Sequence, residues 1–203
     1  MKTNRTELVF ILDRSGSMSG LESDTIGGFN SMLAKQKAEP GECRITTVLF
    51  DHEYEVLHDR IDLKAVEPIG RDEYFVRGNT ALLDAVGTTI NKIGGVQKNT
   101  AKDFQADKVL FVITTDGHEN ASREFAYDAV KDMITHQSEK YAWEFIFLGA
   151  NIDVAKEGRK MGIRADRSYA FDATRDGIKR MYRESAVACY ALRLPRQGVQ
   201  DDS

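Results

Sequence analysis

The chain has 203 residues, which is enough for one α/β domain with a well-buried core. Its 41% hydrophobic and 30% charged residues are typical of a globular protein and exclude a disordered one. The formal net charge of -4 argues against a nucleic-acid binder, and the sequence has no run of eighteen apolar residues that could span a membrane.

Two features of the sequence bear on its cellular location. Residues 1–7 are polar, and the apolar run that follows is too short for the core of a signal peptide, so we expect a cytoplasmic protein. The two cysteines, Cys43 and Cys189, lie far apart and form no C-x-x-C pair. We expect both to be reduced thiols packed in the core.

The first half of the chain alternates apolar runs with a helical pattern. Residues 8–12 form a continuous apolar run, which is typical of a strand buried on both faces. A polar loop follows, and then apolar residues recur at helical spacing until the helix stops before Pro40. Residues 45–50 predict a second strand, and two short alternating segments, 54–57 and 61–66, predict an antiparallel hairpin at the sheet edge.

The second half continues the alternation. Thr80 opens a helix that the pair Gly94-Gly95 should end. Residues 109–113 form the most apolar strand, and Ser122 is the expected N-cap of the next helix. The remaining predicted elements are a strand over 143–148, a helix over 154–161, a short strand over 168–171 and a last helix that includes residues 178–187.

This alternation predicts an α/β fold with a doubly wound, Rossmann-like and mostly parallel sheet, one antiparallel edge strand and helices on both faces. No linker, internal repeat or low-complexity segment divides the sequence. We therefore expect a single domain over residues 1–194 and a flexible tail over residues 195–203.

Two strands of the predicted sheet end in an aspartate, Asp13 and Asp116. Both strands are strongly apolar, so both should be central. If the strands are adjacent, the two carboxylates lie side by side at the carboxyl edge of the sheet, where α/β proteins bind ligands. Two close carboxylates repel each other, and a bound cation is the simplest way to keep both ionised.

Hydroxyl groups accompany these carboxylates. Ser15 and Ser17 follow Asp13 at alternate positions, which lets the three side chains point to one side of an extended turn, and Thr80 adds a hydroxyl from a separate loop. The set consists of oxygens and includes no His or Cys. Such a set suits a hard cation, Mg²⁺ or Mn²⁺ with Ca²⁺ as an alternative, better than Zn²⁺ or copper.

The same residues resemble a known pattern. The sequence D-x-S-x-S at residues 13–17, after an apolar strand, is similar to the metal-ion-dependent adhesion site (MIDAS) of von Willebrand factor type A (vWA) domains. Residues 78–85 resemble the family's threonine loop, with Asn79 where many members have glycine, and residues 115–117 resemble its second aspartate loop. The resemblance covers nearly the whole chain and is to small stand-alone prokaryotic or phage members.

The resemblance implies a role for each of the five residues. Ser15, Ser17 and Thr80 would ligate the metal through their hydroxyls, and Asp13 and Asp116 would act largely through bound waters. The remaining coordination position would accept an Asp or Glu of a partner protein. Neutral hydroxyls suit this function because they leave the metal electron-poor and able to attract an outside carboxylate.

Four neighbouring residues are candidates for a rim that the partner contacts: Met18, Asn79, His118 and Glu119. Taken singly, each ligand candidate also has a structural explanation, since aspartate and threonine cap helices or loops and serine forms turns. The prediction of a metal site therefore depends on the joint pattern.

The predicted function is metal-dependent protein binding without catalysis, and two other functions compete with it. One is a metal-independent scaffold or assembly protein with the same fold. The other is a metal-dependent hydrolase or phosphotransferase, but Ser15 stands where an enzyme of the haloacid dehalogenase type needs its second aspartate. The sequence also has no P-loop and no G-x-S-x-G nucleophile motif.

Overall fold

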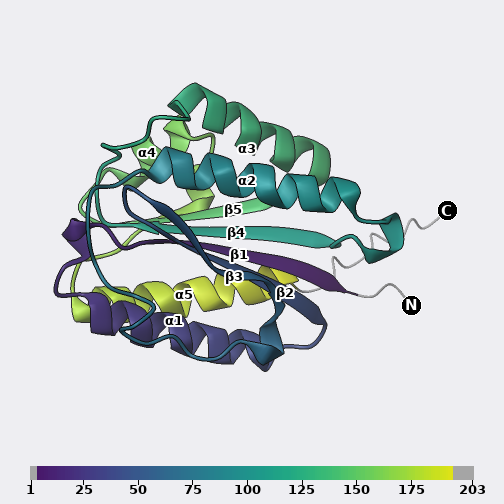
Figure 1. The fold of residues 1–203 in the computed structure, drawn as a ribbon, viewed down its shortest axis with the longest axis horizontal. Helices are drawn as coiled ribbons and strands as arrows, with labels where there is room; N and C mark the ends of the chain where they lie inside the picture. Colours follow the sequence, from purple (N-terminus) through teal and green to yellow (C-terminus); the bar gives the residue numbers. More distant parts are fainter. Residues whose placement is uncertain (1–3, 194–203) are drawn as a thin grey trace.

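The computed structural model describes residues 4–193, and within them six strands form one sheet in the order β3-β2-β1-β4-β5-β6 (Figure 1). The strands are β1 (Arg5–Asp13), β2 (Glu42–Phe50), β3 (Tyr54–Asp62), β4 (Lys108–Thr115), β5 (Glu144–Gly149) and β6 (Ser168–Ala170). All neighbouring strands are parallel except β2 and β3. The prediction of a mostly parallel sheet with one antiparallel edge strand is thereby confirmed.

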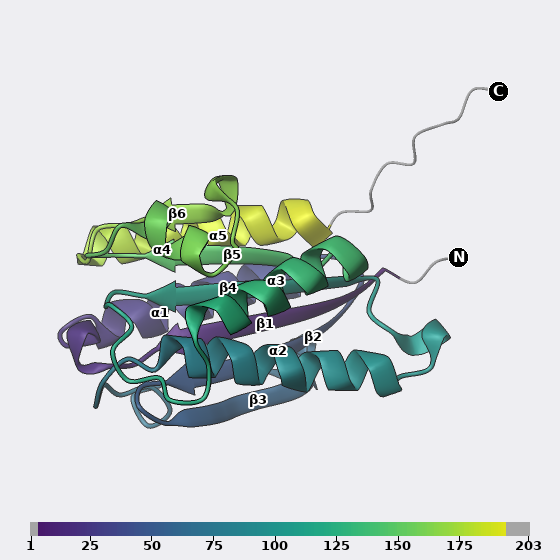
Figure 2. The ribbon, with the colours of Figure 1, turned by 90° about the horizontal axis from the view of Figure 1, so that it is seen from above.

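Five α-helices of this described part cover the two faces of the sheet. They are α1 (Glu22–Lys37), α2 (Leu82–Asn99), α3 (Tyr127–Tyr141), α4 (Val154–Lys160) and α5 (Arg175–Arg193). Helices α1 and α5 lie on one face and α2, α3 and α4 on the other (Figure 1, Figure 2), as the predicted doubly wound fold requires. None of these helices combines the length and the apolar character needed to cross a membrane. The predicted tail, residues 195–203, lies outside the described residues.

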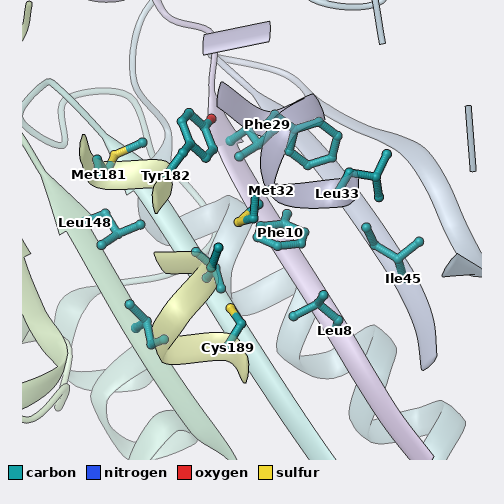
Figure 3. Close-up of a cluster of buried hydrophobic side chains, with 14 of the residues drawn as sticks. Leu8, Phe10, Phe29, Met32, Leu33, Ile45, Leu148, Met181, Tyr182 and Cys189 are labelled. Atoms are coloured by element: carbon teal, nitrogen blue, oxygen red, sulfur yellow. The ribbon is translucent and has the colours of Figure 1, made fainter. Parts of the chain in front are cut away.

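Side chains of each central strand alternate between two cores, because successive residues of a strand point to opposite faces. On the face covered by α1 and α5, Leu8 and Phe10 of β1 pack among side chains of both helices (Figure 3). The ring of Phe10 meets that of Phe29 edge to face, with centroids 5.5 Å apart. Val9 and Ile11 point into the other core, beneath α2 and α3. This burial on both faces explains why the central strands are continuous apolar runs.

The predicted edge hairpin is a single strand. β3 runs without a break over Tyr54–Asp62 and pairs antiparallel with β2, where the sequence suggested two short segments. Two irregularities in the register of the β2–β3 ladder, and the left-handed conformation of Arg60 (φ 51°), disturb the regular alternation along the strand. The disturbed alternation made one strand look like two.

The predicted end of α2 was wrong. The helix continues through Gly94 and Gly95 to Asn99, although a glycine in a helix interior costs about 1 kcal/mol relative to alanine. Contacts with the following loop hold the extra turn, since Oε1 of Gln97 accepts the amide of Ala106 at 3.0 Å. Tertiary contacts therefore outweigh the local signal of the two glycines.

The predicted caps of α2 and α3 were also wrong. Thr80 lies two residues before α2 begins, and its hydroxyl is used elsewhere. Ser122 does not cap α3, which begins only at Tyr127, and its Oγ instead accepts the amide of Asp84 in the first turn of α2 at 3.1 Å. The carboxylate of Asp84 in turn accepts the amides of residues 123–125, which binds this stretch to α2.

Candidate metal centre

The candidate site lies at the carboxyl edge of the sheet, where the arrowheads of β1 and β4 lie on the left in Figure 1. The two strands are parallel neighbours, so Asp13 at the end of β1 and Asp116 just after β4 meet at this edge. From β1 the sheet extends to β2 on one side and to β4 on the other, which makes this edge the topological switch point where open α/β sheets bind ligands. Three loops carry the other candidates: the hydroxyl loop (residues 14–20), the threonine loop (77–80) and the second aspartate loop (116–126).

Three hydroxyl groups join the two aspartates into one chain of contacts. Oγ1 of Thr80 donates to Oγ of Ser15 at 3.0 Å. Oγ of Ser15 lies 3.1 Å from Oγ of Ser17, which donates to Oδ1 of Asp116 at 2.5 Å. The amide of Ser15 donates to Oδ1 of Asp13 at 2.7 Å. The structure therefore brings together all five residues that the sequence predicted as metal ligands.

Backbone contacts fix the threonine loop to both of its neighbours. The carbonyl of Gly78 accepts the amide of Gly16, and the amide of Thr80 donates to Oδ1 of Asn120. Gly78 has a φ of 66°, and a Cβ atom there would lie 1.9 Å from Nδ1 of His52, so only glycine fits. These contacts hold the hydroxyl of Thr80 against that of Ser15.

Gly117 leaves room for the hydroxyl groups. A Cβ atom at this position would lie 3.1 Å from Oγ of Ser17 and 3.3 Å from Oγ1 of Thr80. Both contacts are tighter than ordinary van der Waals contact. The glycine therefore keeps side-chain carbon out of the space where the hydroxyl oxygens converge.

Asp13 is almost fully buried, and its pKa is raised to about 6. Burial causes the rise, hydrogen bonds from Ser15 and Thr115 oppose it, and the charge of Asp116 adds to it. Oγ1 of Thr115 donates to Oδ2 of Asp13 at 2.6 Å. This role of Thr115 was not predicted, although a hydroxyl residue directly before the second aspartate is visible in the sequence.

Asp116 has one oxygen without a partner. The residue is 2% exposed, and while Oδ1 accepts the hydroxyl of Ser17, the buried Oδ2 has no hydrogen bond. Burial raises the pKa of this carboxyl, and the hydrogen bond from Ser17 lowers it. Within residues 4–193, neither Asp116 nor Asp13 forms an ion pair with a basic side chain. Two buried carboxylates without a cationic partner are costly, so a divalent cation fits this pair.

The donor set is unusual because hydroxyls outnumber carboxylates in it. No group of three or more His, Cys, Asp or Glu side chains in the described part of the chain is placed to hold a metal ion. The candidate ligands are instead two carboxylates and three hydroxyls, all of them oxygen donors. Such donors fit a hard cation such as Mg²⁺ or Mn²⁺.

A buried ion-pair network that was not predicted from the sequence lies beside these loops. Asp51 follows β2 and is fully buried. Its Oδ2 accepts a hydrogen bond from Nε of Arg14, in the hydroxyl loop, at 2.9 Å. The same oxygen accepts a second hydrogen bond from Nε of Arg77, in the threonine loop, at 2.8 Å. Burial raises the pKa of Asp51, but hydrogen bonds from Arg77, a backbone amide and Arg14 outweigh it and lower the pKa below its usual value. One carboxylate therefore links two loops of the site.

The four predicted rim residues divide into two pairs. Asn79 and His118 are exposed at the edge of the site, where a partner can reach them. Met18 is 4% exposed, and the carboxylate of Glu119 accepts the amide of Leu83 in α2 and two amides of its own loop. The burial of Met18 does not fit a rim position, whereas Glu119 is half-buried and contact of Asn79, His118 and Glu119 with a partner stays a prediction.

No protein-family model matches the sequence, and a comparison with curated proteins finds no significant match. Solved structures do match the fold. The vWF domain of the type V pili tip protein Mfa5 from Porphyromonas gingivalis has a TM-score of 0.66 at 12% identity, over 98% of this chain and 99% of that one. A D319A mutant of the PilB minor pilin from Streptococcus sanguinis has a TM-score of 0.63 at 11% identity, over 92% of this chain and 61% of that one.

A third similar structure is that of proximal thread matrix protein 1 from the mussel byssus, with a zinc-occupied MIDAS motif. Its TM-score is 0.60 at 12% identity, over 92% of this chain and 46% of that one. The present chain thus spans less than two thirds of the pilin and of the matrix protein. At such low identities the likeness concerns the fold, and the chain has the fold of von Willebrand factor type A domains.

Proposed function

We propose that the chain is a metal-dependent protein-binding module, in which a divalent cation at the candidate centre accepts a carboxylate from a partner protein. The observation that carries the proposal is the pair Asp13 and Asp116. These two buried carboxylates have no basic partner among the described residues. Asp13 accepts the amide of Ser15 and the hydroxyl of Thr115, Asp116 accepts the hydroxyl of Ser17, and one oxygen of Asp116 is left unbonded. The zinc-occupied MIDAS motif of the mussel matrix protein supports the proposal through the shared fold.

Each candidate ligand has a part in this function. Ser15, Ser17 and Thr80 would hold the cation through neutral oxygens, while Asp13 and Asp116 would balance its charge. The bound cation would supply a Lewis-acidic position that is open to an outside oxygen ligand. Because three of the five donors are neutral, the centre would keep a net attraction for an Asp or Glu of the partner.

Binding without catalysis is part of the proposal. The similar structures carry the names of pilus and thread-matrix proteins and not of enzymes. The proposed metal is Mg²⁺ or Mn²⁺, which suit an all-oxygen set. A metal-independent scaffold with the same fold is the competing function, and metal binding distinguishes the two.

The first experiment measures the melting temperature of the chain in EDTA and in about 10 mM Mg²⁺ or Mn²⁺. A site with a Kd of about 0.1 mM adds roughly 2.7 kcal/mol to the free energy of unfolding at this concentration. For a chain of this size the gain corresponds to a rise of about 5–10 °C. The rise should disappear in Asp116→Ala, which removes the carboxylate with the unbonded oxygen.

Asp132→Ala is the matched control, because Asp132 is an exposed aspartate on α3, away from the candidate centre. It should retain the full rise in melting temperature. Equal melting temperatures of the native chain with and without metal would refute the metal centre and favour the metal-independent scaffold. A rise that survives in Asp116→Ala would place the metal elsewhere on the protein.

A further inference from the structure

Phe75 is an exposed aromatic residue beside the candidate metal centre. Its side chain is 44% exposed. The six other exposed large hydrophobic residues of the described chain lie elsewhere: on the edge strands β3 and β6, on α5, or at the opposite end of the sheet. A single apolar ring therefore stands out on an edge that is otherwise formed by polar loops.

The residues around Phe75 fix its position relative to the candidate ligands. Tyr74 is fully buried, and its Oη donates to the carbonyl of Asp13 at 2.6 Å. The amide of Arg77 donates to the carbonyl of Arg14 at 2.8 Å. Both bonds join this segment to the chain that carries the aspartate and serine ligands, so the ring is held at a constant place beside them.

Two guanidinium groups support the ring. Cζ of Arg14 lies 5.4 Å and Cζ of Arg77 lies 5.8 Å from the centroid of the Phe75 ring. Arg14 is fully buried, and the ring of Phe75 covers part of its guanidinium group. Asp51 holds both arginines in place. The exposed part of the ring is therefore a rigid apolar surface that loses little freedom on binding.

From this arrangement we infer that Phe75 is a second contact point for the partner, which presents a bulky apolar side chain close to the acidic residue bound by the metal. The inference rests on the proposed metal-dependent function and adds the chemistry of the partner to it. Aromatic side chains that are rigid and partly exposed are typical anchors of protein interfaces. The metal would select the acid, and Phe75 would select its apolar neighbour.

Small carboxylates test the inference without knowledge of the partner. Acetate carries the carboxylate alone, whereas 3-phenylpropionate, 4-phenylbutyrate and 5-phenylvalerate add a phenyl group at increasing distance. Their affinities for the Mn²⁺-loaded chain can be measured by water-proton relaxation, because a carboxylate displaces water from the metal. We expect at least one phenyl compound to bind about five- to tenfold more tightly than acetate. Phe75→Ala should abolish this difference and leave the affinity for acetate unchanged.

Phe104→Ala is the matched control. Phe104 is also an exposed phenylalanine beneath an arginine, with Cζ of Arg5 5.3 Å from its ring centroid, but it lies at the opposite end of the sheet. This variant should retain the preference for phenyl compounds. Phe75→Leu keeps an apolar cover over Arg14 and should retain part of the preference, so it separates loss of the contact from loss of the fold.

The outcomes separate this inference from the proposed function. Equal affinities of acetate and all phenyl compounds, or a preference that survives in Phe75→Ala, would overturn the apolar contact and leave the metal centre intact. A Mn²⁺-loaded chain that binds no carboxylate would overturn both the apolar contact and the acidic partner. A chain that binds no Mn²⁺ would overturn the metal centre as well.

Discussion

Asp51 lies outside the candidate ligand set but contacts the loops on both sides of it. Its carboxylate accepts hydrogen bonds from Arg14 and Arg77, and its backbone carbonyl accepts the amide of Ala81 at 2.8 Å. The hydroxyl loop, the end of β2 and the threonine loop therefore meet at one residue. The geometry of the three hydroxyls depends on a carboxylate that would not touch the metal.

Asp51→Asn should lower the free energy of unfolding by about 3 kcal/mol, as measured by urea denaturation. The substitution leaves the fully buried guanidinium of Arg14 without its main partner, and breaking a buried ion pair in this way costs about 3–5 kcal/mol. We expect the lower end of this range because Oε2 of Glu55 remains 2.7 Å from Nη1 of Arg14. The same variant should bind Mn²⁺ more weakly than the native chain.

Asp59→Asn is the control, since Asp59 forms an exposed ion pair with Lys92 and its loss should cost less than about 1 kcal/mol. The pH dependence gives a second readout. The pKa of Asp51 is lowered in the folded state, so its contribution to stability is present above the ordinary value of 3.8 and is lost as the pH falls through the folded pKa. Asp51→Asn should therefore lose less stability on acidification than the native chain, and an equal loss would contradict the network.

The five candidate ligands could be predicted because they belong to linear motifs: four of them follow or end two strongly apolar strands, and Thr80 lies in the separate motif of residues 78–85. Asp51 follows a third predicted strand, residues 45–50, so an aspartate at a strand end was visible there as well. Its role could not be derived in the same way, because the pairing with Arg14 and Arg77 depends on how three distant segments meet. The burial of Met18 escaped prediction for the same reason.

At the scale of helices, α1 and α5 pack closely where α1 has no side chain. A Cβ atom on Gly28 of α1 would lie 2.1 Å from Cδ2 of Tyr182, which is 3% exposed on α5. The aromatic ring thus fills the space that a larger residue in α1 would need. This contact fixes the distance between the two helices that cover one face of the sheet.

Gly28→Ala should lower the free energy of unfolding by about 1–3 kcal/mol, because the added methyl group forces the Tyr182 ring or the helix to move. Gly27→Ala is a control in the same helix, since Gly27 is exposed and its Cβ position is open. It should raise the free energy by about 0.5–1 kcal/mol through the better helix propensity of alanine. Urea denaturation of both variants checks the pair, and changes of the same sign would refute the close packing.

Element types could be predicted from periodicity, whereas element ends depended on tertiary contacts. Ser122 has the residue type of a helix cap, but it bonds to the first turn of α2 and leaves α3 to begin five residues later. The glycine pair 94–95 should end a helix by its local propensity, yet α2 continues. Ser122 bonds to a residue 38 positions away, and Gln97 bonds to the loop that follows its helix, so neither helix end is set by its local pattern alone.

At the scale of the whole molecule, the central place of β1 and β4 could be predicted from their apolar composition alone. A strand covered on both faces must be apolar on both, and the most apolar strands proved to be inner neighbours. The adjacency of Asp13 and Asp116 follows from this order. The cytoplasmic location and the prokaryotic or phage type of the chain stay predictions.

The two cysteines are buried, so their accessibility to a thiol reagent measures whether the fold is intact. Cys43 lies on β2 and Cys189 on α5, and both are buried in the core that α1 and α5 cover. Burial raises the pKa of the Cys43 thiol to about 11 and that of Cys189 to about 12, above the ordinary value of 9.0. Since the folded values are raised, the stability that neutral burial contributes is complete below about pH 9 and is lost as the pH rises through the folded pKa.

A thiol-labelling experiment at pH 8, where this contribution is complete, tests whether α5 can open by itself. The single-thiol variants Cys43→Ala and Cys189→Ala should both resist an aromatic disulfide reagent in buffer and react fully in urea, because the thiolate is the reactive form and both thiols are buried and neutral. If the fold opens as one unit, the two labelling rates should rise together with urea and fall together when Mg²⁺ stabilises the native state. Fast labelling of Cys189 with protection of Cys43 would instead show that α5 detaches from the sheet separately. The candidate centre would then lie beside a movable helix, and metal affinity could change with the position of α5.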